Sequence, residues 1–208
     1  MVLPRYILTF LFLLSACTPT PQPTQVMVNA YATSAATPWL AELYACAEKN
    51  NAAINISADS PDIFLRVGEP EMIASPVYQI DEVEILVVAH RENNLQSLTL
   101  AEVQDLFAQE NPSGSAQIWV YPSAADMQRV FDQLVMQGRS VSSSAKIAVS
   151  VQNMSDVLKS DPAAIGILPR QSLTEDLREV FSAGRVPVLA VTKEEPQGML
   201  GKLISCLQ

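Results

Sequence analysis

The chain has 208 residues, of which 49% are hydrophobic and 17% are charged, and its formal net charge is -9. This balance is typical of a globular protein and excludes a disordered one. A chain this acidic carries no electrostatic footprint for nucleic acid, and it would not adhere to anionic lipid by charge alone.

The first feature along the chain is a short apolar segment that ends at a cysteine. Residues 6–16 are mostly apolar and follow Arg5. This segment is too short for a membrane-spanning helix, which needs about 20 residues, but it suits the apolar region of a signal peptide. The sequence Leu14-Ser15-Ala16-Cys17 resembles a bacterial lipobox, in which the cysteine is lipidated and the peptide before it is removed. Ordinary secretion and a retained anchor are the alternatives.

A Pro/Thr string follows at residues 18–24 and contains no apolar side chain to bury. Alternating prolines favour an extended, semi-rigid tether. We therefore expect a signal peptide at 1–16 and a lipidated cysteine with its tether at 17–24. The mature protein would then lie on the extracytoplasmic face of the cell membrane, held by acyl chains such as palmitate on Cys17.

Two cysteines remain once Cys17 is assigned to lipid. In an oxidising compartment an even pair suggests one disulfide, between Cys46 and Cys206. Two separate buried thiols are the alternative. The chain has one histidine and no CxxC pattern, so a zinc site is not expected. No pairing of a nucleophile with a base is visible, so we expect neither an enzyme nor a cofactor.

The first part of the folded region alternates strands with a helix. Apolar runs predict strands at 26–30, 54–56 and 62–66. A helix is predicted between the first two strands, with Thr37 as its N-cap, Pro38 in its first turn and Asn50 at its end. The order strand, helix, strand, strand is typical of an α/β layer.

The second part begins with a long β-rich segment at 77–90 and continues as alternating helices and strands. A capping box at 99–102 opens one helix, Ser123 is expected to cap a second, and another box at 172–175 predicts a third. Gly166 lies within a predicted strand, where a glycine indicates the close approach of another group. The remaining strands are predicted at 118–121, 147–151, 164–169 and 186–192, and the remaining helices at 155–158 and 197–207.

Three stretches of this region stand in a distinctive order and spacing. They are PDIFLRVGEP at 61–70, LQSLTLAEVQDLFAQE at 95–110 and DPAAIGILPRQSL at 161–173. Together they resemble phosphate-type solute-binding proteins of ABC transporters. The resemblance implies an α/β, two-lobed periplasmic-binding-protein-like fold of type II, with a central cleft and two crossover strands. It places lobe 1 at 25–86 and 168–208 and lobe 2 at 87–167.

The resemblance and the physics of such folds point to the same places for a ligand. In open α/β sheets ligands lie outside the carboxyl ends of the strands, at helix N-termini whose free N–H groups favour an anion. The candidate ligand-binding residues are Thr33, Ser34, Thr37, Arg66, Ser123 and Ala124. Helix capping is the alternative role for the hydroxyl side chains, and a salt bridge to Asp62, Glu69 or Glu71 is the alternative for the arginine.

The second lobe differs from the family's usual pattern. The family carries an Arg, an Asp and a Ser-Gly-Thr turn before the helix that begins here near Ser123, whereas this chain has WVYPSAADMQRVF. Tyr121 stands in the position of the arginine. Asp126 lies in the first helical turn, where its carboxylate satisfies the N-terminus and would compete with a bound anion.

The resemblance implies a solute-binding lipoprotein of an ABC importer. Its lobes would close on a small solute, such as phosphate or another oxyanion, and the closed form would dock on a permease. The resemblance also implies that Cys46 and Cys206 lie in lobe 1, on two helices able to pack side by side. A non-transport binding or sensor module of the envelope, built on the same fold, is the alternative.

Overall fold

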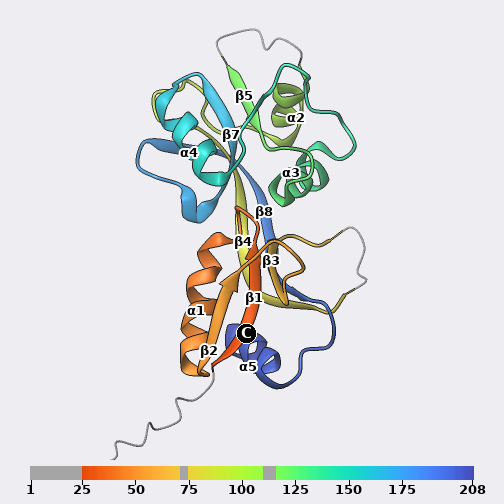
Figure 1. The fold of residues 1–208 in the computed structure, drawn as a ribbon. Coiled ribbons are helices and arrows are strands. Elements are labelled where there is room, and N and C mark those ends of the chain that lie inside the picture. Colours follow the sequence, from red (N-terminus) through yellow and green to blue (C-terminus); the bar gives the residue numbers. More distant parts are fainter. Residues whose placement is uncertain (1–24, 71–74, 110–115) are drawn as a thin grey trace, which may run out of the picture.

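The computed structural model describes residues 25–70, 75–109 and 116–208. In this part the chain forms two α/β lobes stacked end to end and joined by two long strands (Figure 1). The expected signal peptide, Cys17 and the tether lie outside the described residues. None of the helices described is both long enough and apolar enough to span a membrane.

The two long strands are β4 (Val77–His90) and β8 (Leu177–Thr192), which pair antiparallel from one lobe into the other. The described strands form one sheet in the order β2-β1-β3-β8-β4-β7-β5-β6. Lobe 1 lies on the β3 side of this central pair and lobe 2 on the β7 side. The expected two-lobed α/β fold with two crossover strands is therefore confirmed.

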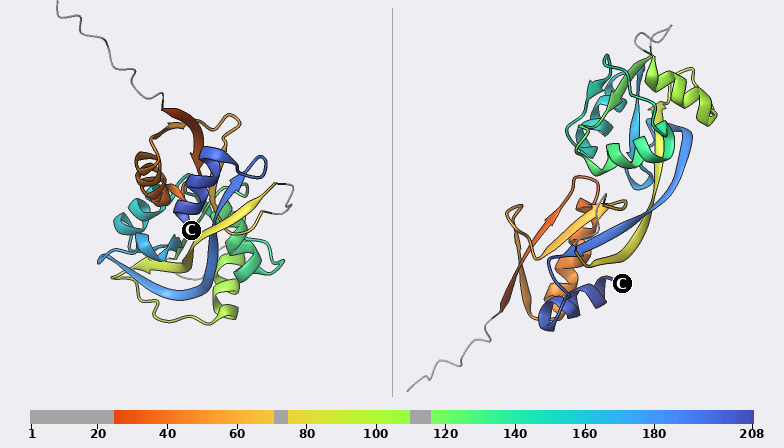
Figure 2. Two further views of the ribbon diagram at one scale, coloured as in Figure 1. Left: turned by 90° about the horizontal axis from the view of Figure 1, so that it is seen from below. Right: turned by 90° about the vertical axis from the view of Figure 1, so that its right-hand side faces the viewer.

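Lobe 1 packs three parallel strands against two helices. Its elements are β1 (Val26–Ala32), η1 (Thr37–Trp39), α1 (Leu40–Lys49), β2 (Ala52–Ile56), β3 (Ile63–Val67) and α5 (Gly198–Leu207). Ala30, Ile63 and Leu65 of the strands are fully buried, as is Leu43 of α1. The helices α1 and α5 lie side by side at the base of this lobe (Figures 1 and 2).

Lobe 2 is built around β7, which is buried along its whole length. Its elements are α2 (Leu100–Ala108), β5 (Gln117–Val120), α3 (Asp126–Phe131), the π-helical turn η2 (Asp132–Met136), β6 (Lys146–Ile147), α4 (Val151–Ser160), β7 (Ala164–Pro169) and η3 (Arg170–Ser172). A Cβ atom built on Gly166 would lie 2.4 Å from Met154 Sδ of α4. The close approach expected at this glycine is confirmed, and so is the capping box at 99–102.

The strand register shows where the chain passes between the lobes. β8 begins beside the lobe 2 end of β4, where Leu177 pairs with His90. It ends beside β3, where Thr192 pairs with Ile63. The second passage between the lobes therefore lies within β8. β7 and the start of β8 stay with lobe 2 because both pair with the same end of β4.

Two local predictions are wrong because long-range pairing or a different cap prevails. No helix follows the capping box expected at 172–175, since residue 177 already begins the pairing of β8 with β4. The strand expected at 147–151 is limited to β6, because Ser150 caps α4 and its side chain accepts from the N–H of Asn153. In both cases the backbone groups find partners that the local sequence does not indicate.

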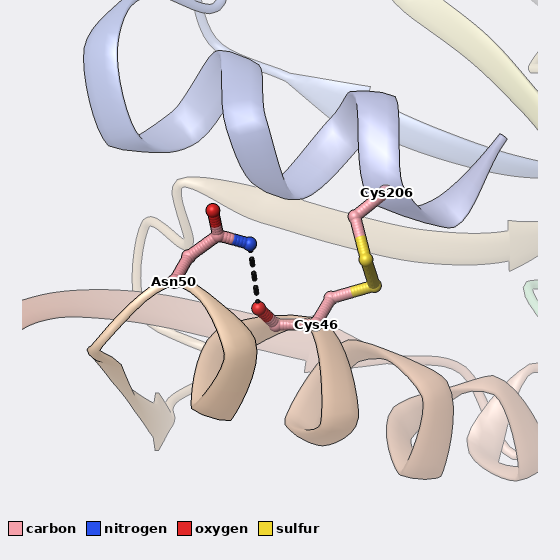
Figure 3. Close-up of a disulfide and its surroundings, with 3 residues drawn as sticks. All are labelled: Cys46, Asn50 and Cys206. Atoms are coloured by element: carbon pink, nitrogen blue, oxygen red, sulfur yellow. Dashed lines mark hydrogen bonds between the residues drawn. A yellow bond between two sulfur atoms is a disulfide. The ribbon is translucent and has the colours of Figure 1, made fainter.

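The predicted disulfide between Cys46 and Cys206 is present, with a Cα–Cα distance of 5.8 Å (Figure 3). It joins α1 to α5 across a sequence separation of 160 residues. Beside it, the side-chain amide of Asn50 donates to the carbonyl oxygen of Cys46 at 2.8 Å and closes the end of α1. In the chain-entropy model a loop of this length contributes up to about 5 kcal/mol to stability. Lobe 1 is therefore clamped between its first and last helices.

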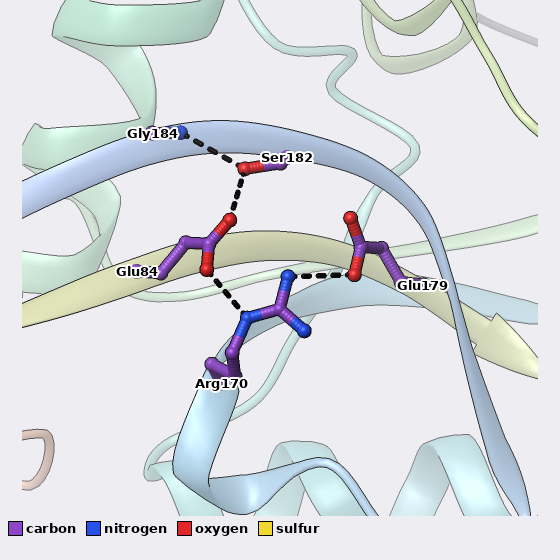
Figure 4. A network of polar contacts seen from close by, with 5 residues as sticks. All are labelled: Glu84, Arg170, Glu179, Ser182 and Gly184. Carbon is purple, nitrogen blue, oxygen red and sulfur yellow. Dashed lines mark hydrogen bonds and ion pairs between the residues drawn. The ribbon is translucent and has the colours of Figure 1, made fainter.

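A polar network braces the crossover strands (Figure 4). Arg170 donates to Glu84 of β4 at 2.5 Å and to Glu179 of β8 at 2.7 Å. The hydroxyl of Ser182 donates to the other carboxylate oxygen of Glu84 at 2.7 Å, and the N–H of Gly184 donates to that hydroxyl at 3.3 Å. The register of the strands shifts in this stretch, and Gly184 has a φ of +105°. The network thus holds an irregular section of the pairing between β4 and β8.

Acid should weaken this network. Hydrogen bonds from Arg170, and secondly from Ser182, lower the pKa of Glu84 from 4.5 to about 2. A carboxylate whose pKa is lowered by folding stabilises the fold above its unfolded pKa, and the contribution is lost as the pH falls from about 4.5 to about 2. At pH 6 we expect Glu84→Gln to reduce the free energy of unfolding by roughly 0.5–1 kcal/mol, a small effect because the pair is partly exposed.

Urea unfolding of both proteins between pH 2 and pH 6 measures this effect. The two unfolding free energies should converge toward pH 2, because most of the stabilising contribution of Glu84 is then lost from the wild type. Glu175→Gln, an exposed change in the loop before β8, is the control and should keep the wild-type pH dependence. A constant difference between wild type and Glu84→Gln at all these pH values would contradict the prediction.

Candidate functional site

The loop between β1 and η1 lies where lobe 1 meets lobe 2. Its first residue, Thr33, is fixed to the sheet by its N–H, which donates to the carbonyl oxygen of Leu65 at 3.0 Å. The N–H of Ala36 donates back to the carbonyl oxygen of Thr33 at 3.0 Å. This turn directs the hydroxyls of Thr33 and Ser34 toward two different helices of lobe 2.

The first of these helices is α3, which begins with the carboxylate of Asp126. One carboxylate oxygen, Oδ2, accepts from the hydroxyl of Thr33 at 2.6 Å and from the N–H of Val67 at 2.9 Å. The other oxygen accepts from the N–H of Met127 at 2.9 Å. Asp126 is only 6% exposed. A hydroxyl and a backbone N–H of lobe 1 therefore hold one oxygen of a lobe 2 carboxylate, and donors of this kind hold oxyanions strongly.

The second helix is α4, whose first residue is Val151. Its N–H donates to the hydroxyl oxygen of Ser34 at 2.8 Å. The N-cap of α4, Ser150, accepts from Asn153 instead, at 3.1 Å. Ser34 therefore supplies, from the other lobe, an acceptor for an N–H that a helix leaves without an internal partner.

Gly68, directly after β3, brings the backbone of lobe 1 into close contact with α3 of lobe 2. This glycine has a φ of +72°, and a Cβ atom built on it would lie 2.4 Å from Val130 Cγ2 of α3. Its N–H donates to the carbonyl oxygen of Pro187 in β8 at 2.8 Å. Both the backbone conformation and the contact with α3 therefore favour glycine at this position.

Arg66, the predicted cation of the site, is buried at the end of β3. Its guanidinium donates to the carbonyl oxygens of Gly68 at 3.0 Å and Glu69 at 3.2 Å. These bonds shape the loop that places Gly68 against α3. The predicted ligand contact of Arg66 is not tested by this arrangement and stays a prediction.

Thr37 lies one turn further along the chain than Thr33 and Ser34, which form the junction between the lobes with Val67, Asp126 and Val151. Its hydroxyl donates to the carbonyl oxygen of Thr33 at 3.1 Å. The N-cap of η1 is Ala36, and no side chain caps it. The N-cap role predicted for Thr37 is therefore wrong, because the chain turns one residue earlier than the sequence suggests.

Ser123 and Ala124 are exposed in the loop between β5 and α3. The N-cap of α3 is Ala125, whose N–H donates to the carbonyl oxygen of Pro122 at 2.8 Å. This tight turn separates Ser123 from the helix, so the capping role predicted for it is wrong. Ser123 instead lines an open cavity of about 650 Å³ within lobe 2. Its predicted ligand contact and that of Ala124 remain predictions.

Tyr121, at the position of the family's arginine, is buried at 3% exposure. Its hydroxyl donates to the carbonyl oxygen of Ile167 at 2.8 Å. Burial, and secondly the charge of Asp126, raises the pKa of this phenol well above its usual value. Tyr121 therefore stays protonated and contributes a hydrogen bond inside lobe 2, without a positive charge for a ligand.

An open groove of about 470 Å³ runs beside the crossover strands and is lined by residues of both lobes. Trp39 lies at its wall, and its indole N–H donates to Asp81 at 2.9 Å. Two other lining residues, Glu84 and Arg170, pair with each other. Within the described ranges, no group of three or more His, Cys, Asp or Glu side chains could hold a metal ion.

By its fold the chain is a two-lobed protein of the type II periplasmic-binding-protein class. A protein from Clostridium perfringens, assigned as a phosphate ABC transporter substrate-binding protein and solved with bound phosphate, matches with a TM-score of 0.75 and 16% identity. The match covers 87% of this chain and 92% of that chain. An ABC-type phosphate transport receptor from Vibrio cholerae matches with a TM-score of 0.65 and 13% identity, over 86% and 93% of the two chains.

The same fold also occurs in regulatory proteins. The OxyR2 regulatory domain from Vibrio vulnificus matches with a TM-score of 0.61 and 9% identity, over 88% of this chain and 96% of that one. No protein family model and no curated protein sequence matches the chain. The solved neighbours confirm the sequence resemblance at the level of the fold, and identities this low carry no further conclusion about function.

Three groups at the junction were not among the predicted contacts. The sequence shows that Asp126 lies in the first turn of α3, but it does not show its partners in lobe 1. Val67 and Val151 contribute backbone N–H groups, which every residue except proline has. No pattern of residue types could have identified them.

The contact between Gly68 and Val130 predicts a steric conflict on substitution. Gly68→Ala should lower the free energy of unfolding by roughly 1–3 kcal/mol, because the added methyl group meets Val130. Gly138→Ala is the matched control, since Gly138 also has a positive φ, +91°, but nothing lies within 4 Å of an added Cβ. The control measures the cost of the backbone conformation alone.

Urea unfolding of these variants, with Val130→Ala and the double variant, completes a double-mutant cycle. Gly68→Ala should cost less in the Val130→Ala background than in the wild type. Equal losses from Gly68→Ala and Gly138→Ala, with no coupling to Val130, would show that the methyl group meets no obstacle.

Proposed function

We propose that this protein is a lipid-anchored solute-binding protein of the cell envelope that delivers a small oxyanion to an ABC importer. The fold supports this proposal, because it is shared with phosphate-transport proteins from two organisms. The observation that carries the proposal is the convergence of the Thr33 hydroxyl and the Val67 N–H on one carboxylate oxygen between the lobes. A phosphate-like solute offers acceptor oxygens of the same kind.

The proposed cycle uses the crossover strands as the hinge. The lobes would separate by bending β4 and β8 near the irregular section beside Gly184. A solute would then reach the donors at the carboxyl ends of β1 and β3, and closure against α3 would bury it. The permease would recognise the closed arrangement of the two lobes. No bond in the solute is made or broken.

The lipid anchor is the second part of the proposal. The lipobox-like sequence that ends at Cys17 and the Pro/Thr string after it support it. The tether would connect the lipidated Cys17 to the start of β1, which belongs to lobe 1. Lobe 2 would then be the lobe that moves relative to the anchored one.

A non-transport binding or sensor module on the same fold is the second candidate. The contact of Asp126 with lobe 1 favours it, because a side chain of the protein itself bonds to the donors that a solute would use. The regulatory domain among the structural neighbours shows that the fold occurs outside transport. The response to solute distinguishes the two candidates.

A thermal-shift screen tests the solute. Phosphate, sulfate, molybdate, tungstate and small carboxylates should include at least one anion that stabilises the wild type. At 100 times its dissociation constant such an anion adds about 2.7 kcal/mol by mass action. Thr33→Val should lose this stabilisation because it lacks the donor hydroxyl. Thr174→Val, an exposed change in the loop before β8, is the matched control and should keep it.

The absence of any shift in the wild type across the screen would argue against an oxyanion carrier and favour the non-transport module. A shift that persists in Thr33→Val would place the anion elsewhere.

Metabolic labelling with a palmitate analogue tests the anchor. The wild-type protein should take up the label and remain with the membrane fraction, since several acyl chains bind a bilayer firmly. Cys17→Ser should lose the label, whereas Cys46→Ser, which removes a cysteine of the disulfide, should keep it. Label retained by Cys17→Ser would refute the lipoprotein assignment.

A further inference from the structure

The Asp126 carboxylate makes more bonds to the opposite lobe than to its own. Of its three hydrogen bonds to residues that the structure describes, two reach Thr33 and Val67 of lobe 1, and the third stays within α3 at Met127. The partners in lobe 1 are 93 and 59 residues away in the sequence. The side chain therefore serves a contact between the lobes.

Local helix capping does not account for this arrangement. A capping carboxylate belongs to the N-cap residue and accepts from an N–H two or three residues further on. Here the N-cap is Ala125, which has no capping side chain, and Asp126 is already the first residue of α3. Its Oδ2 oxygen points across the junction to the ends of β1 and β3 instead.

The donors that meet Asp126 are those that would receive an oxyanion. Thr33 offers a hydroxyl directly after β1, and Val67 offers a backbone N–H as the last residue of β3. Both lie at the carboxyl ends of strands, where ligands of open α/β sheets lie. A second negative charge at these donors would lie beside the buried carboxylate and be repelled by it. A free anion and Asp126 therefore exclude each other at this position.

A second contact between the lobes depends on the same loop. Ser34, next to Thr33, accepts from the N–H of Val151 at the start of α4. Asp126 takes no part in this bond, since it lies on α3. The bond between Val151 and Ser34 therefore shows whether the lobes are in contact. It is independent of any effect that a substitution of Asp126 has on the stability of α3.

We propose that Asp126 is a built-in carboxylate ligand that holds the two lobes closed without solute, and that an incoming oxyanion must displace it from Thr33 and Val67. The closed, solute-free state is then the resting state of the protein. The part that concerns displacement rests on the proposed solute-binding function, whereas the part that concerns closure does not.

The proposal has a quantitative consequence for affinity. When only a fraction of the molecules is competent to bind, the apparent dissociation constant equals the intrinsic one divided by that fraction. If about one molecule in ten has Asp126 withdrawn, removing the side chain should tighten anion binding by about tenfold. The latch formed by Asp126, Thr33 and Val67 thus sets the solute concentration at which the protein responds.

The closure is tested on the solute-free protein with small-angle X-ray scattering and amide hydrogen exchange. Asp126→Ala should increase the radius of gyration and accelerate exchange of the Val151 N–H, which lies on a different helix. Asp132→Ala is the matched control, because Asp132 accepts from Gln128 within lobe 2. It should leave both measurements at their wild-type values.

Thr33→Val removes one partner of the latch without altering α3. It should accelerate Val151 exchange in the same direction, though less, because Val67 still donates to Asp126. An unchanged radius of gyration and unchanged Val151 exchange in both Asp126→Ala and Thr33→Val would overturn the proposal. If Asp126→Ala folds poorly, the result for Thr33→Val alone decides the test.

Calorimetric titration with inorganic phosphate tests the displacement. Asp126→Ala should bind at least about tenfold more tightly than the wild type, and Asp132→Ala should bind as the wild type does. Binding by the wild type that equals or exceeds that of Asp126→Ala would refute displacement. If Asp126→Ala opens the lobes but no oxyanion of the earlier screen binds to either protein, the closure is supported and the proposed solute class fails.

Discussion

The pairing of β4 with β8 is the constraint on which the rest of this structure depends. The two strands pass antiparallel through both lobes, and all other described strands are added at their two sides. Because their backbone groups are committed to each other, the lobes cannot separate by translation. They can only bend relative to each other. The pairing is least regular where Ile85 to Val88 of β4 lie beside Glu179 to Gly184 of β8, because the register shifts twice there.

The contacts between the lobes are consistent with such a bending motion. Three polar contacts between the lobes gather at one place, where the ends of β1 and β3 face the starts of α3 and α4. At the same place the backbone of Gly68 packs against the side chain of Val130.

The sequence predicts the elements whose periodicity or caps are strong. The helix after Thr99, the buried strand around Gly166 and the last helix appear as expected, because burial and capping agree there. The helix expected after the capping box at 172–175 does not form, because the local cap competes with the pairing of β8 with β4, which depends on the whole fold.

The candidate site could be predicted only in part, for a related reason. The sequence identifies Thr33 and Ser34 as polar residues after a strand, and it notes the carboxylate of Asp126. It cannot show that these groups meet, because 93 residues separate Thr33 from Asp126. The remaining donors are backbone N–H groups, whose direction is set by the fold and not by residue type.

The disulfide between Cys46 and Cys206 has a mechanical consequence. It closes a covalent ring that contains all of lobe 2 and both crossover strands, while the segment before α1 lies outside the ring. A force applied between the two ends of the described chain would pass through β1, α1, the disulfide and the last turn of α5. It would bypass lobe 2 entirely, so tension on the N-terminal side of the chain would load one lobe and leave the other free to move.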